Sequence, residues 1–160
     1  MDLLAGQLTL HLLTADEVER VLRRQRLPGE KWADDYPSFE QIDFLEAYLV
    51  ELRSARPENY WQGQLRRRID DTVVGGAGVT GPPDDEGAVV IGYELAAGLS
   101  DELHGVDIIK ALQTVAREMG ATRVTTTVFD DDRVRLQVYV AAGLNEVRRD
   151  GRVVHLGHYL

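Results

Sequence analysis

The chain contains no cysteine among its 160 residues. This absence excludes disulfide bonds, thiolate-bound zinc, iron–sulfur clusters and a cysteine nucleophile. Lysine is nearly absent too, since Lys31 and Lys110 are the two lysines of the chain, whereas arginine is abundant. Such a bias is typical of GC-rich bacterial genomes and carries no information about mechanism.

Basic residues are also in deficit overall. The chain has 18 Lys and Arg against 27 Asp and Glu, a formal net charge of −9 and a sequence pI near 4.9. A chain with this charge repels nucleic acid and anionic membranes, so we expect neither as a partner. No apolar run approaches the roughly 18 residues that span a bilayer. The first residues show no basic leader with a cleavage site, so we expect a cytoplasmic protein.

The length and composition indicate one globular domain over residues 1–160. Apolar residues make up 44% and charged residues 28%, which argues against global disorder. A chain of this length buries about two-thirds of its unfolded surface. No repeat, linker or low-complexity segment divides it.

Hydrophobic periodicity and turn residues predict alternating strands and helices. The predicted strands are 7–13, 60–69, 72–80, 88–95, 122–129, 146–149 and 152–156. The predicted helices are 15–26, 39–55, 101–119 and a last one that is opened by residues 130–132 and ends at Gly143. This order predicts an α+β domain with a mixed sheet.

Local signals place the ends of several of these elements. Thr14 with Glu17, and Ser38 with Gln41, have the capping-box pattern that starts a helix. A Pro-Gly pair at 28–29 is expected to stop the first helix. The Asp-Gly pair between the last two strands predicts a type I′ hairpin turn.

Two segments resemble the GNAT family of acyl-CoA N-acyltransferases. Residues 73–96 are similar to the third and fourth strands of the branch that includes the ribosomal-protein N-terminal acetyltransferases. Residues 136–147 resemble its final helix and turn, with Gly143-Leu144 where the family has Gly-Phe. The resemblance implies a mixed, mostly antiparallel seven-stranded sheet flanked by about four helices. A splayed pair of parallel strands would form the cofactor cleft.

The resemblance also implies transfer of an acetyl group from acetyl-CoA to an amine by direct attack. Tyr139 would be the general acid that returns a proton to the thiolate, and either Glu94 or an ordered water would take the proton of the amine. The acceptor would be a small molecule or a protein N-terminus, and the acidic Asp34-Asp35 loop favours a cationic one. No metal is implied.

The family pattern places cofactor contacts at six positions. They are Leu95, Ala96, Ala97, His104, Gly105 and Asp132. The first three would pair with the pantetheine arm through their backbone, and an N–H near Leu95 or Ala96 would polarise the thioester carbonyl. His104 and Gly105 would bind the pyrophosphate at the helix N-terminus. Asp132 stands where the family favours an asparagine that holds the CoA arm.

The phosphate loop departs from the family pattern. The expected Arg or Gln and the first glycine fall on Ser100 and Leu103, and Asp101 and Glu102 add two carboxylates beside the phosphate position. Arg135 also replaces a usual serine or alanine. A second function therefore stays open, that of a GNAT-fold protein that has lost acetyl-CoA binding and acts as an interaction or regulatory module. A Leu103 side chain turned into the cleft would exclude the cofactor, whereas acids turned to solvent would leave the backbone amides available.

Each candidate side chain also has a purely structural interpretation. Tyr139 fits the apolar face of a helix, Glu94 an exposed position on a strand, and His104 an exposed helix start. His155 and His158 are three apart in a predicted strand, so they face opposite sides and do not form a metal pair. Both interpretations of each side chain stay open at this point, as do a monomer and a homodimer.

Overall fold

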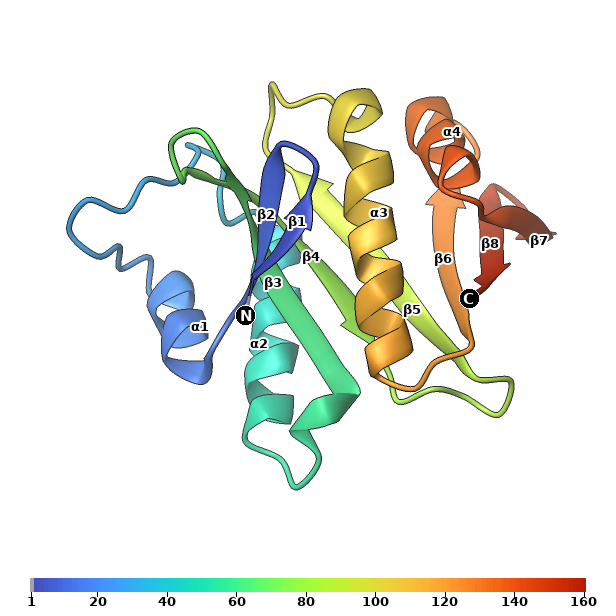
Figure 1. Ribbon diagram of the computed structural model, residues 1–160, viewed down its shortest axis with the longest axis horizontal. Coiled ribbons are helices and arrows are strands. Elements are labelled where there is room, and N and C mark those ends of the chain that lie inside the picture. The colour runs from blue at the N-terminus through green and yellow to red at the C-terminus, as the bar shows by residue number, and fades with distance from the viewer. Residues whose placement is uncertain (1) are drawn as a thin grey trace.

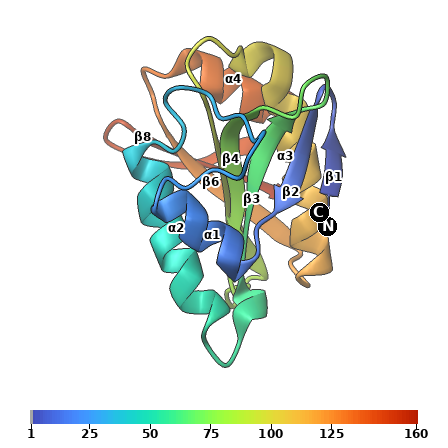
Figure 2. The same cartoon turned by 90° about the vertical axis from the view of Figure 1, so that its left-hand side faces the viewer.

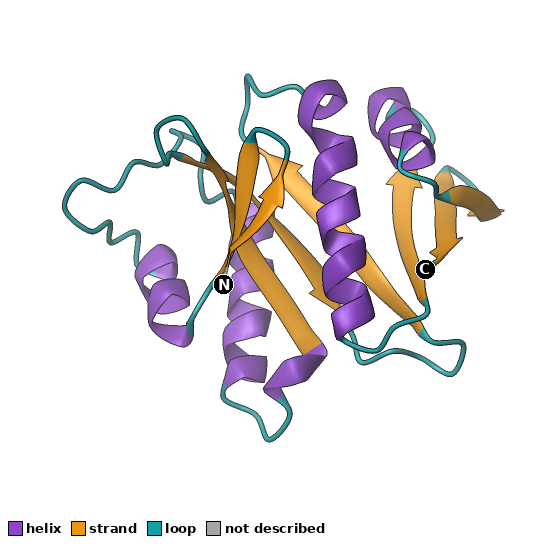
Figure 3. Cartoon of the chain, viewed as in Figure 1, coloured by secondary structure: helices purple, strands orange, loops and turns teal. Residues whose placement is uncertain are grey.

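The computed structural model describes residues 2–160 as one eight-stranded sheet with helices on both faces (Figure 1, Figure 3). The strands are β1 (Asp2–Ala5), β2 (Leu8–Leu12), β3 (Tyr60–Arg67), β4 (Val73–Thr80), β5 (Ala88–Leu95), β6 (Arg123–Phe129), β7 (Asn145–Asp150) and β8 (Val153–Tyr159). Their order across the sheet is β1-β2-β3-β4-β5-β6-β8-β7. Every neighbouring pair is antiparallel except β5 and β6, which run parallel.

Four α-helices and a short 3-10 turn complete the described part of the chain. They are α1 (Ala15–Leu22), α2 (Phe39–Leu52), η1 (Pro57–Asn59), α3 (Asp101–Glu118) and α4 (Arg133–Ala141). The turned view shows α1 and α2 on one face of the sheet and α3 on the other (Figure 2). Helix α4 follows β6 and packs against α3.

The predicted α+β class and the mixed, mostly antiparallel sheet are confirmed, but the sheet has eight strands rather than seven. The additional strand is β1, which pairs with β2 from Asp2 opposite His11 to Ala5 opposite Leu8. It has four residues, too few for periodicity to show, and its turn depends on Gly6 at a φ of +62°.

Both capping boxes form as predicted. The Thr14 and Ser38 hydroxyls accept from the N–H groups of Glu17 and Gln41, whose side chains accept from the cap N–H groups in return. The predicted end of the first helix at residue 26 is wrong, because α1 ends at Leu22 and Arg24 has a φ of +54°. The left-handed residue turns the chain before the Pro-Gly pair is reached.

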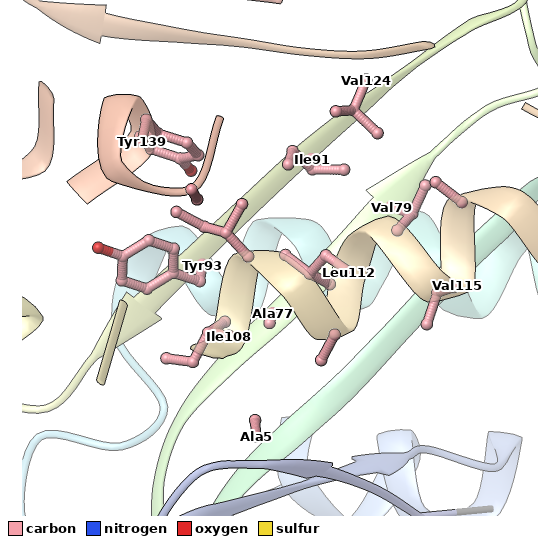
Figure 4. Packing of buried hydrophobic residues seen from close by; sticks show 14 of the residues in the cluster. Ala5, Ala77, Val79, Ile91, Tyr93, Ile108, Leu112, Val115, Val124 and Tyr139 are labelled. Carbon is pink, nitrogen blue, oxygen red and sulfur yellow. The ribbon is translucent and has the colours of Figure 1, made fainter. Parts of the chain in front are cut away.

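The main core lies between the sheet and α3. Alternate residues of β4 and β5 point toward α3, among them Ala77, Val79, Ile91 and Tyr93, and pack against its buried face. Figure 4 shows this packing, with Tyr93 of β5 close to Tyr139 of α4. The opposite face of β4 and β5 carries glycines, polar residues and the exposed Val90, and a cavity lies there under α2.

The parallel strands β5 and β6 diverge soon after they begin. Their pairing runs from Ala88 opposite Arg123 to Val90 opposite Thr125 and stops there. Strand β5 continues to Leu95 and leads into α3, while β6 leads into α4. A crevice at the carboxyl ends of parallel strands is a common position for ligands.

Gly105 allows α3, α4 and β5 to meet. A Cβ atom built on it would overlap Val138 Cγ1 of α4 and lie 2.9 Å from the Tyr93 hydroxyl. Nearly all the room at this junction is therefore taken by side chains of other elements.

We predict that Gly105→Ala lowers the free energy of unfolding by about 1–3 kcal/mol through overpacking, although alanine favours helices by about 1 kcal/mol. Gly92→Ala is the matched control, because no atom lies within 4 Å of the added Cβ. Urea unfolding of the two variants and the wild type measures the difference. Equal stabilities would show that the junction has spare room.

Candidate active site

A cavity of about 370 Å³ lies on the α2 side of the sheet. Its floor is made by glycines of β4 and β5, with Gly78 opposite Gly92 in the register and Gly76 opposite Glu94. The space above Gly92 is open, whereas the Gln62 side chain covers Gly78 and the Gln41 side chain contacts Gly76. The absence of side chains on these glycines leaves room for the cavity and for the two glutamine side chains that line it. A cavity of this size is in the usual range for small-molecule sites.

Two walls of different charge enclose this floor. Helix α2 and the segment before it contribute Tyr36, Glu40, Gln41 and Phe44, and the far wall consists of side chains from β6 and α4. Arg135 is the cationic residue that lines the cavity. The acidic residues that line the cavity therefore come from α2 and β5, and the cationic one comes from α4, where Asp101 and Asp132 lie beside it.

Glu94 stands between these walls and is half-buried. Its carboxylate accepts a hydrogen bond from the Ser38 hydroxyl at 3.0 Å, so the N-cap of α2 also positions the β5 side chain. Burial raises the pKa of Glu94, and the neighbouring carboxylates of Glu40 and Asp35 raise it further, while Ser38 and Arg135 counteract the rise. A carboxylate with a raised pKa accepts a proton more readily than an ordinary one.

Tyr139 belongs to the core and also lines the cavity. Its side chain is 2% exposed and its ring centroid lies 6.0 Å from that of Tyr93 (Figure 4). Burial raises the pKa of Tyr139, and a hydrogen bond with Thr126 counteracts part of the rise. The phenol is therefore protonated at neutral pH. The structural and the catalytic interpretations of this residue are compatible.

The backbone of β5 presents one open edge to the crevice. The Ala96 N–H donates to the Val74 carbonyl at 2.7 Å, which makes that pair hydrogen-bonded. In an antiparallel ladder the adjacent pair, Leu95 opposite Gly75, is then not hydrogen-bonded, so the N–H and C=O of Leu95 point toward β6. Because β6 has already diverged, this edge is available to an extended ligand.

Two of the backbone groups predicted to bind the cofactor already have partners. The Ala96 N–H is taken by Val74, so of the two groups expected to polarise the thioester, Leu95 alone keeps an outward N–H. The Ala97 N–H donates to the Asp35 carboxylate at 2.8 Å. The loop before α2 is folded against the β5–α3 connection, which the sequence did not indicate.

The start of α3 is less obstructed than its sequence suggests. Leu103 is 59% exposed and does not turn into the cleft, and Glu102 is exposed as well. Asp101 lies 3.6 Å from Arg135 of α4, which neutralises one of the two acids. The Ser100 hydroxyl caps the helix by accepting from the Leu103 N–H.

His104 and Gly105 are both buried at this helix start, so the expectation of an exposed histidine is wrong. Gly105 faces Val138 and Tyr93, and this packing accounts for the absence of a side chain. Asp132 is the N-cap of α4, and its carboxylate accepts from the Arg135 N–H at 3.1 Å.

Sequence reasoning missed three residues of the site. Ser38 had a signal, since its capping box was identified, but its second hydrogen bond to Glu94 joins residues 56 positions apart. No local sequence pattern marks Tyr36. Its hydroxyl accepts a hydrogen bond from the Gln64 side-chain amide inside the fold. Arg135 was noted as a replacement, and its place in the cavity wall was not foreseen.

Metal and membrane features are not found in the part of the chain that the structure describes. Within residues 2–160 no three His, Asp or Glu side chains are grouped to hold a metal ion. None of the helices there has the length and apolar character to cross a bilayer.

Comparison with solved structures identifies the same architecture in several acetyltransferases. A ribosomal-protein-S5-alanine acetyltransferase from Vibrio fischeri superimposes with a TM-score of 0.70 at 11% identity, covering 99% of this chain and 96% of that one. The GNAT domain of S. lividans PAT gives 0.68 at 15% identity, covering 100% and 96%. The Campylobacter jejuni N-acetyltransferase PseH, solved with acetyl coenzyme A, gives 0.62 at 11% identity, covering 95% and 98%. No protein-family model and no curated protein sequence matches the chain.

We predict that Ser38→Ala raises the pKa of Glu94 further, because the carboxylate loses the hydrogen bond that stabilises its charged form. The same change removes the cap of α2 and costs about 1 kcal/mol of stability. Thr14→Ala, at the other capping box, is the control with a similar cost in stability. Titration of the glutamate carboxyl carbons by NMR measures the pKa of Glu94 in the two variants. A Glu94 pKa that moves equally in the two variants would contradict the assignment.

Proposed function

Since the chain has the fold of the GNAT acetyltransferases, we propose that it transfers an acetyl group from acetyl-CoA to an amine. The observation that carries the proposal is the position of Glu94 and Tyr139 on one cavity beside the open edge of β5. A base, an acid and an edge for an extended thioester are the parts that such a transfer needs. They come from β5 and α4, on the two sides of the crevice.

The chemistry at this cavity is direct attack on the thioester. The amine nitrogen forms a bond to the carbonyl carbon and loses a proton to Glu94. The carbon–sulfur bond then breaks, and the Tyr139 hydroxyl gives a proton to the departing thiolate. The outward N–H of Leu95 is the backbone group in position to polarise the carbonyl oxygen.

The acceptor that suits this cavity is a cationic amine. Glu94 and Glu40 line the cavity, and Asp35 lies close enough to raise the pKa of Glu94. A protonated amine is attracted by these carboxylates, loses one proton to solvent and attacks as the neutral amine, whose next proton goes to Glu94. One structural neighbour is a spermidine N-acetyltransferase chimera, at 13% identity and a TM-score of 0.65.

The second candidate is a protein of this fold that no longer binds acetyl-CoA. The Asp35 carboxylate on the Ala97 N–H favours it, because that amide is closed to an incoming arm. The exposed Leu103 and the pairing of Asp101 with Arg135 favour the enzyme, because the helix start is not blocked.

Acetyl-CoA binding is the first test. We expect the purified protein to bind acetyl-CoA with a micromolar Kd by calorimetry. At 100 times Kd the ligand then adds about 2.7 kcal/mol of stability, which a thermal shift records. If a folded sample gives no heat of binding at millimolar acetyl-CoA, the proposed enzyme activity is overturned and the interaction module is the candidate that is left.

With an amine acceptor identified by screening, Tyr139→Phe is expected to lower kcat by about 10²–10⁴-fold, because the thiolate then leaves without a positioned proton donor. Tyr48→Phe is the matched control. Tyr48 is also buried and hydrogen-bonded, to the Leu13 carbonyl, but it does not line the cavity. Equal rates for Tyr139→Phe and the wild type would remove Tyr139 from the mechanism.

The pH profile tests Glu94. The carboxylate accepts a proton in its charged form alone, so kcat/KM rises with pH through the pKa of Glu94, above the ordinary value of 4.5. In Glu94→Gln this limb is expected to disappear and kcat/KM to fall by about 10²-fold or more. If kcat/KM of Glu94→Gln still rises with pH as in the wild type, another group accepts the proton of the amine.

A further inference from the structure

Arg135 has hydrogen-bond donors that the protein does not use. Its Nε atom is buried and has no partner among residues 2–160. The Asp132 carboxylate lies 3.9 Å from Nε, and the Asp101 carboxylate lies 3.6 Å from the terminal Nη2 atom, both longer than a hydrogen bond. A buried donor without a partner costs free energy, so it calls for a partner that arrives later.

A second unused group lies beside it. The Arg135 guanidinium sits 5.0 Å above the ring of Tyr93, whose hydroxyl is buried with no hydrogen bond of normal geometry in the described chain, although burial raises its pKa and the Asp101 carboxylate is near enough to raise it further. The Tyr93 side chain is 6% exposed. Both side chains line the cavity, one from α4 and the other from the open end of β5.

The missing partner is a neutral acceptor rather than a further anion. Two carboxylates already surround the guanidinium and balance its charge. Among the described residues its buried Nε–H still has no acceptor within hydrogen-bond distance, although the side chain lines the cavity. An amide carbonyl oxygen supplies an acceptor and adds no negative charge.

We propose that Arg135 binds the acyl donor through the amide carbonyl oxygens of its thioester arm. This inference rests on the proposed acetyl transfer, which brings such an arm along β5. The guanidinium stays stacked on Tyr93 and keeps Asp101 at its back while its free N–H groups donate to the arm. Arg135 is thus the residue of α4 that binds the acyl donor. It supplies N–H groups to the arm, whereas the Asp132 carboxylate can only accept hydrogen bonds.

The test measures acetyl-CoA binding by calorimetry, without acceptor, for the wild type and Arg135→Ala. We expect Arg135→Ala to weaken binding by about 10- to 100-fold, the range for hydrogen bonds from a charged donor. Asp101→Asn is the matched control, because it removes the ion pair and keeps the guanidinium. Asp101→Asn is expected either to leave the Kd for acetyl-CoA unchanged or to lower it. An equal loss in both variants would mean that Arg135 acts by joining α3 to α4, which overturns the proposal.

A truncated donor separates the arm from the phosphates. Acetyl-pantetheine carries the amide arm without phosphate, so Arg135→Ala should weaken its binding by the same factor as for acetyl-CoA. A loss confined to acetyl-CoA would assign Arg135 to phosphate and overturn the proposal. Tighter binding by Arg135→Ala would show that the side chain obstructs the arm, which also overturns it.

Arg135→Gln guards against misfolding of the alanine variant, since it retains an amide donor. Its Kd should lie between those of the wild type and Arg135→Ala, with an unchanged circular dichroism spectrum. If the wild type binds acetyl-CoA and all Arg135 variants bind it equally, this inference fails and the proposed acetyl transfer stands. If the folded wild type does not bind, both fail.

Discussion

The divergence of β5 from β6 is the constraint on which the rest of the site depends. Three paired residues hold the strands together, from Ala88 to Val90, and beyond them β5 keeps an outward-facing backbone with no neighbouring strand. An unpaired edge inside a sheet is costly unless something pairs with it. The same divergence sends β5 into α3 and β6 into α4, and the starts of these two helices meet through Asp101 and Arg135. The crevice, the open edge and the placement of Tyr139 are consequences of one interrupted ladder.

The two faces of the sheet are filled differently. Alternation puts Val79, Ile91 and Tyr93 against α3. On the other face Leu45 and Tyr48 of α2 pack with Val73 in a second apolar cluster, and the glycines of β4 and β5 leave a cavity beside it. The walls then set its polarity, with Glu94 toward α2 and Arg135 toward α4. A cationic amine and an acyl donor would therefore approach from different ends.

The pairing of Asp101 with Arg135 shows why a local pattern is a poor guide to this helix start. Along the sequence, Asp101 adds charge where a phosphate is expected, and Arg135 replaces a small residue. In the fold the two lie 3.6 Å apart and neutralise each other, although they are far apart in the chain. Leu103, which would exclude the cofactor if it turned into the cleft, is exposed to solvent. Whether a substitution blocks a site depends on where its side chain turns and what meets it there.

The sequence by itself determined the elements, because periodicity, capping boxes and turn residues act within a few positions. Strands β2 to β8, the start of α1, helices α2 to α4 and the α+β class followed from such signals, whereas β1 was too short to give one. The tertiary structure alone decided which hydrogen-bonding groups of the site already have a partner and which do not. The bond from Ala97 to Asp35, the bond from Ser38 to Glu94 and the unused donors of Arg135 join segments distant in the chain. Hydrogen bonding between distant segments depends on packing, and no local pattern encodes it.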